Sequence, residues 1–179
     1  DHGIKMDNNL IEYFVSIVPV GMESVVNETK KLIDYKQQGT ISKDEIDNIC
    51  TPSLDVRIFE LVKMLGNKDT KAALKIYSNL LEVKESPLGI LAMMARQFRI
   101  ILKVKYMRHQ GEATQSIVSR TGLRTFMVSE CIRQANNYTF KQLEEALREC
   151  LETDQNIKIG AIAPELGVEL ILVKYSTKK

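Results

Sequence analysis

The chain has 179 residues and a net charge of +2, which is too small to indicate nucleic-acid binding by itself. Apolar residues make up 44% and charged residues 27%, the balance of a folded protein rather than a disordered one. No run approaches the roughly 18 to 20 apolar residues of a membrane span and no signal peptide opens the chain, so we expect a cytoplasmic protein and no membrane.

Two short helices are expected at the start of the chain. The first takes Asp7 or Asn8 as its cap and ends at Pro19, with its apolar residues at helical spacing: Ile11, Phe14, Val15 and Val18. The second runs from about residue 22 to residue 36, and its apolar face comprises Val25 or Val26, Leu32, Ile33 and the ring of Tyr35.

A third helix completes the first part of the chain. Ser42 and Glu45 have the S-x-x-E spacing of a capping box, which predicts a helix start. Thr51 and Pro52 end this helix, and a proline turn between two periodic segments favours a domain boundary. We therefore expect a three-helix unit over residues 1–52 and a second domain over residues 53–179.

The second part of the chain is also expected to be helical. The predicted helices lie at about residues 54–65, 70–83, 87–110, 113–121, 123–136, 140–157 and 164–175. Asp69 is placed to cap one start, Ser86 precedes a proline at the first helical position of another, and Thr139 forms a capping box with Gln142. No strand pattern competes, so the expected fold class is all-α, a small bundle followed by a larger one.

The helix over residues 87–110 is apolar on most of its circumference, which predicts a place at the centre of the bundle. It carries several cations and no acidic residue, and Arg96, Arg99 and Lys103 fall on one face. Such a stripe suits phosphate or an acidic partner. Acidic residues of the helix over residues 140–157 are equally suitable counter-charges, and we favour pairing within the molecule or between subunits.

Catalytic chemistry is not indicated. The two histidines, His2 and His109, lie far apart, and there is no phosphate-binding loop. The three cysteines are widely spaced in apolar surroundings, as expected of buried reduced thiols: Cys50, Cys131 and Cys150. We therefore expect no catalytic site, no metal and no cofactor.

Residues 115–133 have the apolar spacing of a helix-turn-helix, with Gly122 in the turn. Arg124 and Arg133 could reach a DNA backbone, but the other outward side chains of the second helix are poorly suited to base recognition. A helix-turn-helix DNA-binding protein is therefore one alternative function, and an unrelated helical adaptor is another.

Several strings of the sequence, in order, resemble the delta subunit of the bacterial DNA polymerase III clamp loader, over nearly the whole chain. They are N-E-T-K-K-L at residues 27–32, I-S-K-D-E-I at 41–46, I-F at 58–59, G-N-K-D at 66–69, R-Q-F-R at 96–99 and I-K-I-G at 157–160. The segment over residues 120–125 departs from the family because it lacks a proline that often follows the turn there.

The resemblance implies that residues 1–52 are the lid of an AAA+ module and that residues 53–179 are a collar through which five subunits form a ring. The implied partners are the gamma or tau and delta-prime subunits, with primed DNA in the full complex and Lys158 near its path. Contact with the sliding clamp is implied only through an N-terminal domain outside this chain. That fits a chain that opens at Asp1 rather than Met and is expected to be a fragment.

The expected function is therefore non-catalytic support of the loader that places the sliding clamp on primed DNA, within the DNA polymerase III holoenzyme. The resemblance implies no ATP hydrolysis by this subunit and a place at the replisome in the bacterial cytoplasm.

Overall fold

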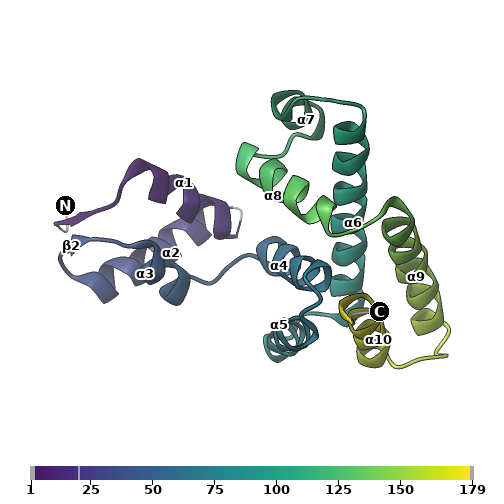
Figure 1. Cartoon of the computed structure of the whole chain (residues 1–179). Coiled ribbons are helices and arrows are strands. Elements are labelled where there is room, and N and C mark those ends of the chain that lie inside the picture. The colour runs from purple at the N-terminus through teal and green to yellow at the C-terminus, as the bar shows by residue number, and fades with distance from the viewer. Residues whose placement is uncertain (1–2, 20, 178–179) are drawn as a thin grey trace. The chain divides into compact units, whose positions relative to one another are not determined.

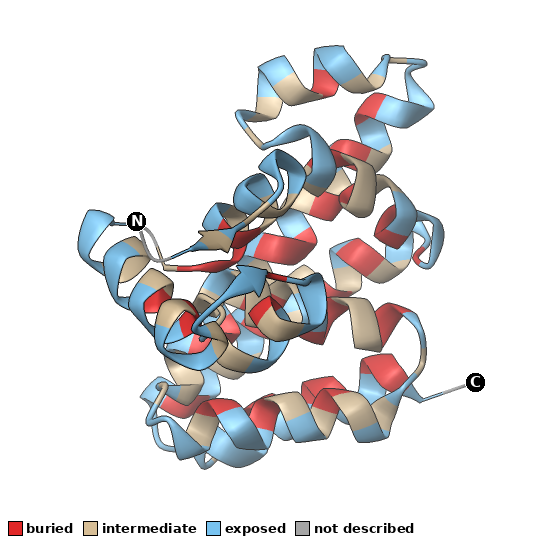
Figure 2. Cartoon of the chain, turned by 90° about the vertical axis from the view of Figure 1, so that its left-hand side faces the viewer, coloured by how far each residue is buried: buried red, intermediate tan, exposed pale blue. Residues whose placement is uncertain are grey.

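The computed structural model describes residues 3–19 and 21–177, whose regular secondary structure is helical apart from one pair of very short strands (Figure 1). The all-α class predicted from the sequence is confirmed. Residues 1–57 and residues 58–179 form two compact units, each with its own buried residues on the inward faces of its helices (Figure 2).

The first unit contains three complete helices and both strands. Its elements are β1 (Ile4–Lys5), α1 (Asn8–Ile17), α2 (Met22–Lys36), β2 (Gly39–Thr40) and α3 (Lys43–Ile49). The strands pair in parallel, with Ile4 opposite Gly39 and Lys5 opposite Thr40. This pair was not predicted, because two residues are too few to show the alternation by which strands are recognised.

An apolar cluster holds the described part of the first unit together, and it comprises Phe14, Ile17, Val18, Leu32, Ile41, Ile46 and Cys50. The predicted capping box of α3 is confirmed: the backbone N–H of Ser42 donates to Glu45 Oε2 at 2.8 Å, and that of Glu45 donates to Ser42 Oγ at 3.3 Å. Asp7 occupies the cap position of α1, but its side chain makes no capping hydrogen bond to the described helix.

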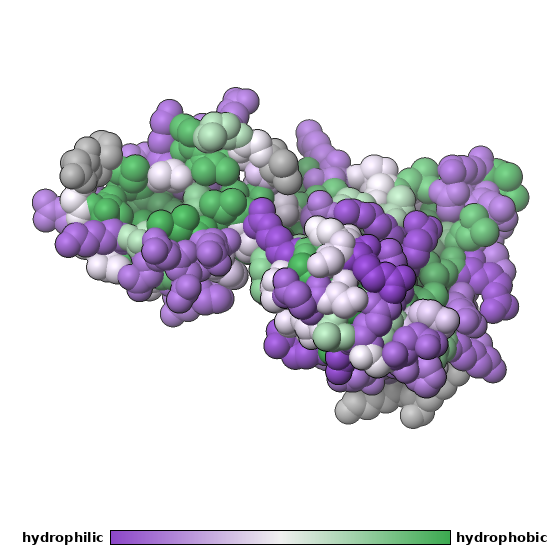
Figure 3. Space-filling model, turned by 90° about the horizontal axis from the view of Figure 1, so that it is seen from above, coloured by the Kyte–Doolittle hydropathy of each residue, from purple (hydrophilic) through white to green (hydrophobic). Residues whose placement is uncertain are grey.

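The apolar faces of α1 and α2 are buried less completely than expected. Ile11 and Val15 are 43% and 39% exposed, and the predicted burial of Tyr35 is wrong, since it is 59% exposed. A unit of this size encloses only the narrow stripe of each helix that meets the core. Apolar side chains consequently gather on the surface of the first unit (Figure 3).

The segment after α3 is fastened to the first unit. The N–H of Thr51 donates to a carboxylate oxygen of the buried Glu28 at 3.0 Å, and the N–H of Ser53 donates to the carbonyl of Ile17 at 2.7 Å. Val56, in the first turn of the next helix, packs on the apolar cluster. The first compact unit therefore extends to residue 57, five residues beyond the boundary expected from the proline turn.

The second unit is a bundle of longer helices. Its elements are α4 (Leu54–Gly66), which begins in the first unit, α5 (Thr70–Glu82), α6 (Pro87–His109), α7 (Thr114–Thr121), α8 (Thr125–Asn136), α9 (Phe140–Lys158) and α10 (Pro164–Ser176). The predicted caps are confirmed: Asp69 accepts from the N–H of Ala72 at 2.9 Å, Ser86 accepts from that of Gly89, and Thr139 forms its capping box with Gln142.

Helix α6 lies at the centre of this bundle, as predicted, and packs against α8, α9 and α10. Its buried residues include Ile90, Leu91, Met94, Phe98, Ile101 and Val104. It is not enclosed on every side, however, because its neighbours leave one face open along its length. The exposed positions of that face are Gly89, Ala92, Arg96, Arg99, Lys103 and Tyr106.

Candidate functional site

Three of the four residues that the sequence indicates as contacts in the clamp-loader interpretation lie together on the open face of α6. Arg96, Arg99 and Lys103 are all exposed, because the opposite side of the helix is buried against α8, α9 and α10. Positions three and four apart share one side of a helix, so the three cations form a single stripe. We call Arg96, Arg99 and Lys103 the α6 basic stripe.

The acidic residues of α9 were expected as counter-charges for this stripe. Three of them pair elsewhere: Glu145 with Lys141 at 3.9 Å, Glu149 with Lys174, and Asp154 with Lys158 at 2.7 Å. Within residues 3–19 and 21–177, no ion pair reaches Arg99 or Lys103. These two cations are therefore open to an external partner.

The fourth candidate, Lys158, stands on a different helix. It is the last residue of α9, is exposed, and donates to Asp154 one turn earlier. The helix dipole favours a cation in the last turn of a helix, so the stability of α9 is sufficient to explain a lysine at position 158. Lys105, which belongs to the same cationic run as the stripe, is also occupied locally, since its ammonium donates to the carbonyl of Ala135 at 2.8 Å.

The helix-turn-helix segment consists of α7 and α8. Gly122 between them has φ 69°, the left-handed conformation that glycine adopts without strain. Helix α8 turns Val128 and Cys131 into an apolar cluster with α6 and α7. Arg133, one of the two arginines considered for DNA contact, is held by Glu130, with Nε donating at 2.6 Å. The segment therefore serves the packing of the bundle.

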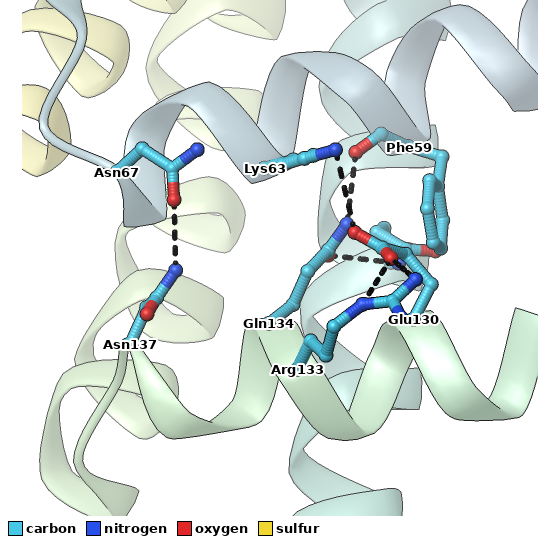
Figure 4. Close-up of polar contacts among 8 residues, drawn as sticks. Phe59, Lys63, Asn67, Glu130, Arg133, Gln134 and Asn137 are labelled. Carbon is cyan, nitrogen blue, oxygen red and sulfur yellow. Dashed lines mark hydrogen bonds and ion pairs between the residues drawn. The ribbon is translucent and has the colours of Figure 1, made fainter.

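A polar cluster joins α4 and α8, and we call it the α4–α8 polar seam (Figure 4). Glu130 lies between two cations, Arg133 on its own helix and Lys63 of α4 at 3.5 Å. The seam borders a hollow of about 370 Å³ lined by Lys63, Asn67, Glu130, Arg133, Gln134 and Asn137. Because the carboxylate is ion-paired on both sides, the arrangement is suited to positioning helices rather than to acid-base chemistry.

Two buried amides continue the seam into the bundle. Gln97 of α6 donates to the side-chain carbonyl of Gln134 at 3.5 Å, and Gln134 donates to the backbone carbonyl of Phe59 at 3.3 Å. Buried amides require such partners, so this relay fixes α4, α6 and α8 against one another. Gln134 was not identified from the sequence. The feature that could have indicated it is a polar residue one turn after Cys131, on the apolar face of the helix.

The described cysteines have the environment of structural thiols. Burial is the main cause that raises the pKa of Cys50 and Cys131 to about 11 and that of Cys150 to about 12. Thiols with such pKa values carry little thiolate at neutral pH and are poor nucleophiles.

His109 packs edge-on against the ring of Phe140, with 5.8 Å between the ring centroids, whereas His2 lies outside the described residues. Over the part of the chain that the structure describes, no three potential metal ligands come together. None of the described helices has the length and apolarity that crossing a membrane requires.

Comparisons with known proteins agree on one family. A family model described as DNA polymerase III delta subunit, C-terminal domain, matches residues 55–175. DNA polymerase III subunit delta of Bacillus subtilis is 29% identical over 164 residues, which cover 91% of this chain and 47% of that protein. The probable DNA polymerase III subunit delta of Aquifex aeolicus is 26% identical over 126 residues, 69% of this chain and 36% of that protein.

A solved structure supports the same relationship. The DNA clamp loader delta protein of Bacillus subtilis superposes with a TM-score of 0.81 at 27% identity, covering 97% of this chain and 52% of that one. The chain thus spans about half the length of the Bacillus subtilis relatives it matches.

Proposed function

The chain belongs to the DNA polymerase III delta-subunit family, and on that premise we propose that it is a non-catalytic part of a bacterial clamp loader. It helps to hold together the assembly that places the sliding clamp on primed DNA, in the cytoplasm at the replisome. The observation that carries this proposal is the likeness to the clamp loader delta protein over 97% of the chain. The helix-turn-helix alternative is not favoured, because that segment packs into the bundle.

In this proposal the two parts of the chain have different roles. Residues 1–52 act as a lid, and residues 53–179 act as a collar that joins the subunits into a ring. The division into two compact units supports these roles, as does a family model that covers most of the second part.

The proposed partners are the gamma or tau subunits and the delta-prime subunit, which bind the collar. The α6 basic stripe contacts acidic side chains of one of these neighbours, and the unpaired state of Arg99 and Lys103 supports this role. Lys158 contacts primed DNA in the complete loader. The sliding clamp is contacted only by the part of the delta subunit that lies outside this chain.

Gel filtration tests the assembly role. Mixed with purified gamma or tau and delta-prime subunits from its own source, the chain should elute in a larger complex that contains all of them. Bovine serum albumin in place of the loader subunits controls for nonspecific association. Elution of the chain at its own unshifted position in every mixture rules out the assembly role.

A further inference from the structure

Among the described residues of the second unit, three large exposed apolar side chains share one face of α10. Leu166, Leu170 and Val173 are 48%, 54% and 42% exposed, and their spacing places them on one face of the helix over two turns. We call these three residues the α10 stripe. On the other side of α10, Val168, Ile171, Leu172 and Tyr175 are buried against α5, α6 and α9.

A helix that is apolar on nearly all sides is normally enclosed on all sides. Among the described residues of the second unit, the other large exposed apolar side chains stand singly: Val83, Tyr106, Phe126, Leu151 and Ile159. Single exposed apolar residues are common on protein surfaces, whereas three on successive turns of one helix mark an interaction surface.

A groove runs beside the α10 stripe. Helix α10 lies next to α5 (Figure 1), and the groove between them has a volume of about 330 Å³. Its lining comprises Leu74, Tyr77, Ser78, Leu81, Glu169 and Val173. Val173 belongs to both the stripe and the groove, so the two form one continuous surface. An apolar stripe beside a groove is the geometry in which proteins receive an amphipathic helix.

The charges at the two edges of this surface differ. Glu165 and Glu169 lie on the α5 side: the carbonyl of Glu165 accepts from the hydroxyl of Tyr77, and Glu169 lines the groove. Neither carboxylate forms an ion pair within the part of the chain that the structure describes. On the other edge, Lys174 is held by Glu149 of α9. The unpaired charge that α10 itself presents at this surface is therefore negative and lies on the α5 side.

This charge pattern disfavours a second copy of the chain as the occupant. In an antiparallel two-fold pair of α10 helices, the Glu165 and Glu169 edges of both copies would lie side by side and repel. In a parallel pair these edges would meet Lys174, which Glu149 already holds. A partner that carries lysine or arginine at this edge would pair with the two carboxylates, which a second copy of the chain would not do.

We propose that the α10 stripe and the α5–α10 groove receive an amphipathic helix from another subunit of the clamp loader. The apolar stripe of that helix is edged by lysine or arginine on the side that faces Glu165 and Glu169. This inference rests on the proposed function and names a second face of the collar, besides the α6 basic stripe, by which the chain contacts another subunit.

The test measures the affinity of the complete chain for the purified loader subunits. Leu166→Gln with Leu170→Gln should weaken the complex at least about tenfold, because these exposed leucines would bury apolar area only in the complex. The matched control is Val83→Gln with Leu151→Gln, two residues that are 56% and 58% exposed and lie outside the surface. The control pair should bind as the unchanged chain does.

A charge-reversal pair tests the acidic edge. Glu165→Lys with Glu169→Lys should weaken the complex, and the loss should shrink as salt is raised, because exposed charges are screened. Glu144→Lys with Glu152→Lys, exposed acids of α9, should have no comparable effect. Circular dichroism and thermal unfolding of each variant separate loss of binding from loss of fold.

The outcomes distinguish this inference from the proposed function. A complex that forms with the unchanged chain and equally well with the leucine variant overturns the α10 surface and leaves the proposed function standing. Failure of the unchanged chain to form any complex overturns the proposed function itself, and this inference with it. A chain that sediments alone as a dimer, and as a monomer once Leu166 and Leu170 are replaced, shows that a second copy is the occupant and overturns the proposed partner.

Discussion

Two buried tyrosines of the second unit differ by one hydrogen bond. Tyr138 and Tyr175 both pack on the ring of Phe98, with centroids 6.0 and 6.1 Å away. The Tyr138 hydroxyl donates to the carbonyl of Val62 at 2.7 Å, whereas the buried Tyr175 hydroxyl forms no hydrogen bond of good geometry in the described structure and interacts only weakly with the Glu149 carboxylate. Burial is the main cause that raises the pKa of both phenols.

Phenylalanine substitutions should therefore have unequal effects. Tyr138→Phe should lower the free energy of unfolding by about 1 kcal/mol, the net value of a typical hydrogen bond. Tyr175→Phe should leave it unchanged or raise it slightly, because only an unsatisfied hydroxyl is lost. Urea denaturation of both variants measures the difference. Equal destabilisation by the two substitutions would contradict the difference in hydrogen bonding between Tyr138 and Tyr175.

The buried thiols predict how stability changes with pH. Their pKa values of about 11 to 12 in the folded chain exceed the value of about 8.5 for a free thiol, so the folded state retains protons that the unfolded state releases. Stability contributed by the protonated thiols is fully present below about pH 8.5 and declines as pH rises toward the folded pKa.

The free energy of unfolding should consequently fall between about pH 8 and pH 10, measured by urea denaturation under reducing conditions. Cys150→Ala removes the thiol with the largest of the three pKa shifts and should make this decline shallower. An unchanged pH slope in Cys150→Ala would show that this thiol is not the cause.

Residue-level predictions from the sequence succeeded where the cause is local. The capping box of Ser42 and Glu45 depends on residues three positions apart, so its spacing was sufficient. The Gln97–Gln134 relay and the exposure of Tyr35 depend on which helices become neighbours, and helical periodicity carries no information about that.

Among the elements of the second unit, one helix pair requires a glycine for its close packing, and a second helical glycine serves as a comparison. A Cβ atom at Gly167 of α10 would lie 2.9 Å from Thr153 Cγ2 and 3.2 Å from Ile157 Cδ1, both on α9. At Gly89, in the first turn of α6, the nearest atom would be Ser86 Cβ at an ordinary 3.7 Å. The α9–α10 approach thus depends on the missing side chain.

Alanine should have opposite effects at these glycines. Gly167→Ala should lower the free energy of unfolding by about 1–3 kcal/mol, the usual range for overpacking. Gly89→Ala should raise it by about 0.5–1 kcal/mol, because alanine loses less backbone entropy in a helix. Thermal unfolding of both variants checks the signs, and a stabilised Gly167→Ala would contradict the close α9–α10 contact.

The α6 basic stripe should contribute more to binding of the loader subunits than cations elsewhere on the surface. Arg99→Glu with Lys103→Glu should weaken association with the loader subunits at least about tenfold at low salt, because like charges would then face an acidic partner. Lys141→Glu with Arg148→Glu changes the net charge equally on the exposed side of α9 and serves as the control. Equal loss in both variants, measured by titration calorimetry, would indicate a general charge effect and remove the stripe from the interface.

The helices were largely predictable because each is marked by caps, prolines or glycines in the sequence. The strand pair Ile4–Lys5 with Gly39–Thr40 was not, because it exists only through tertiary contact. The central place of α6 followed from its apolar circumference, but its open face did not, since the α6 basic stripe and Tyr106 are left uncovered by the arrangement of α8 and α9.

Each of the two units of the chain has a packed apolar core and also exposes side chains that no other part of its own described structure covers or pairs. The first unit has apolar side chains on its exterior, and the second has the α10 stripe and two unpaired cations of α6. The described thiols of both units are buried, and Glu130, the carboxylate of the α4–α8 polar seam, is ion-paired. These features suit a polypeptide that acts by holding other subunits, as proposed for a chain that spans about half of its relatives.

A competition experiment tests whether the chain takes the place of the delta subunit in the loader. The 179-residue chain is added in excess to a clamp loader assembled with the full-length delta subunit, and loading of the clamp onto primed DNA is followed. We expect the chain to occupy the place of the delta subunit without supporting loading, so the rate should fall with its concentration and recover when more full-length delta is added. A loading rate that stays constant at every excess of the chain would show that the chain does not take the place of the delta subunit.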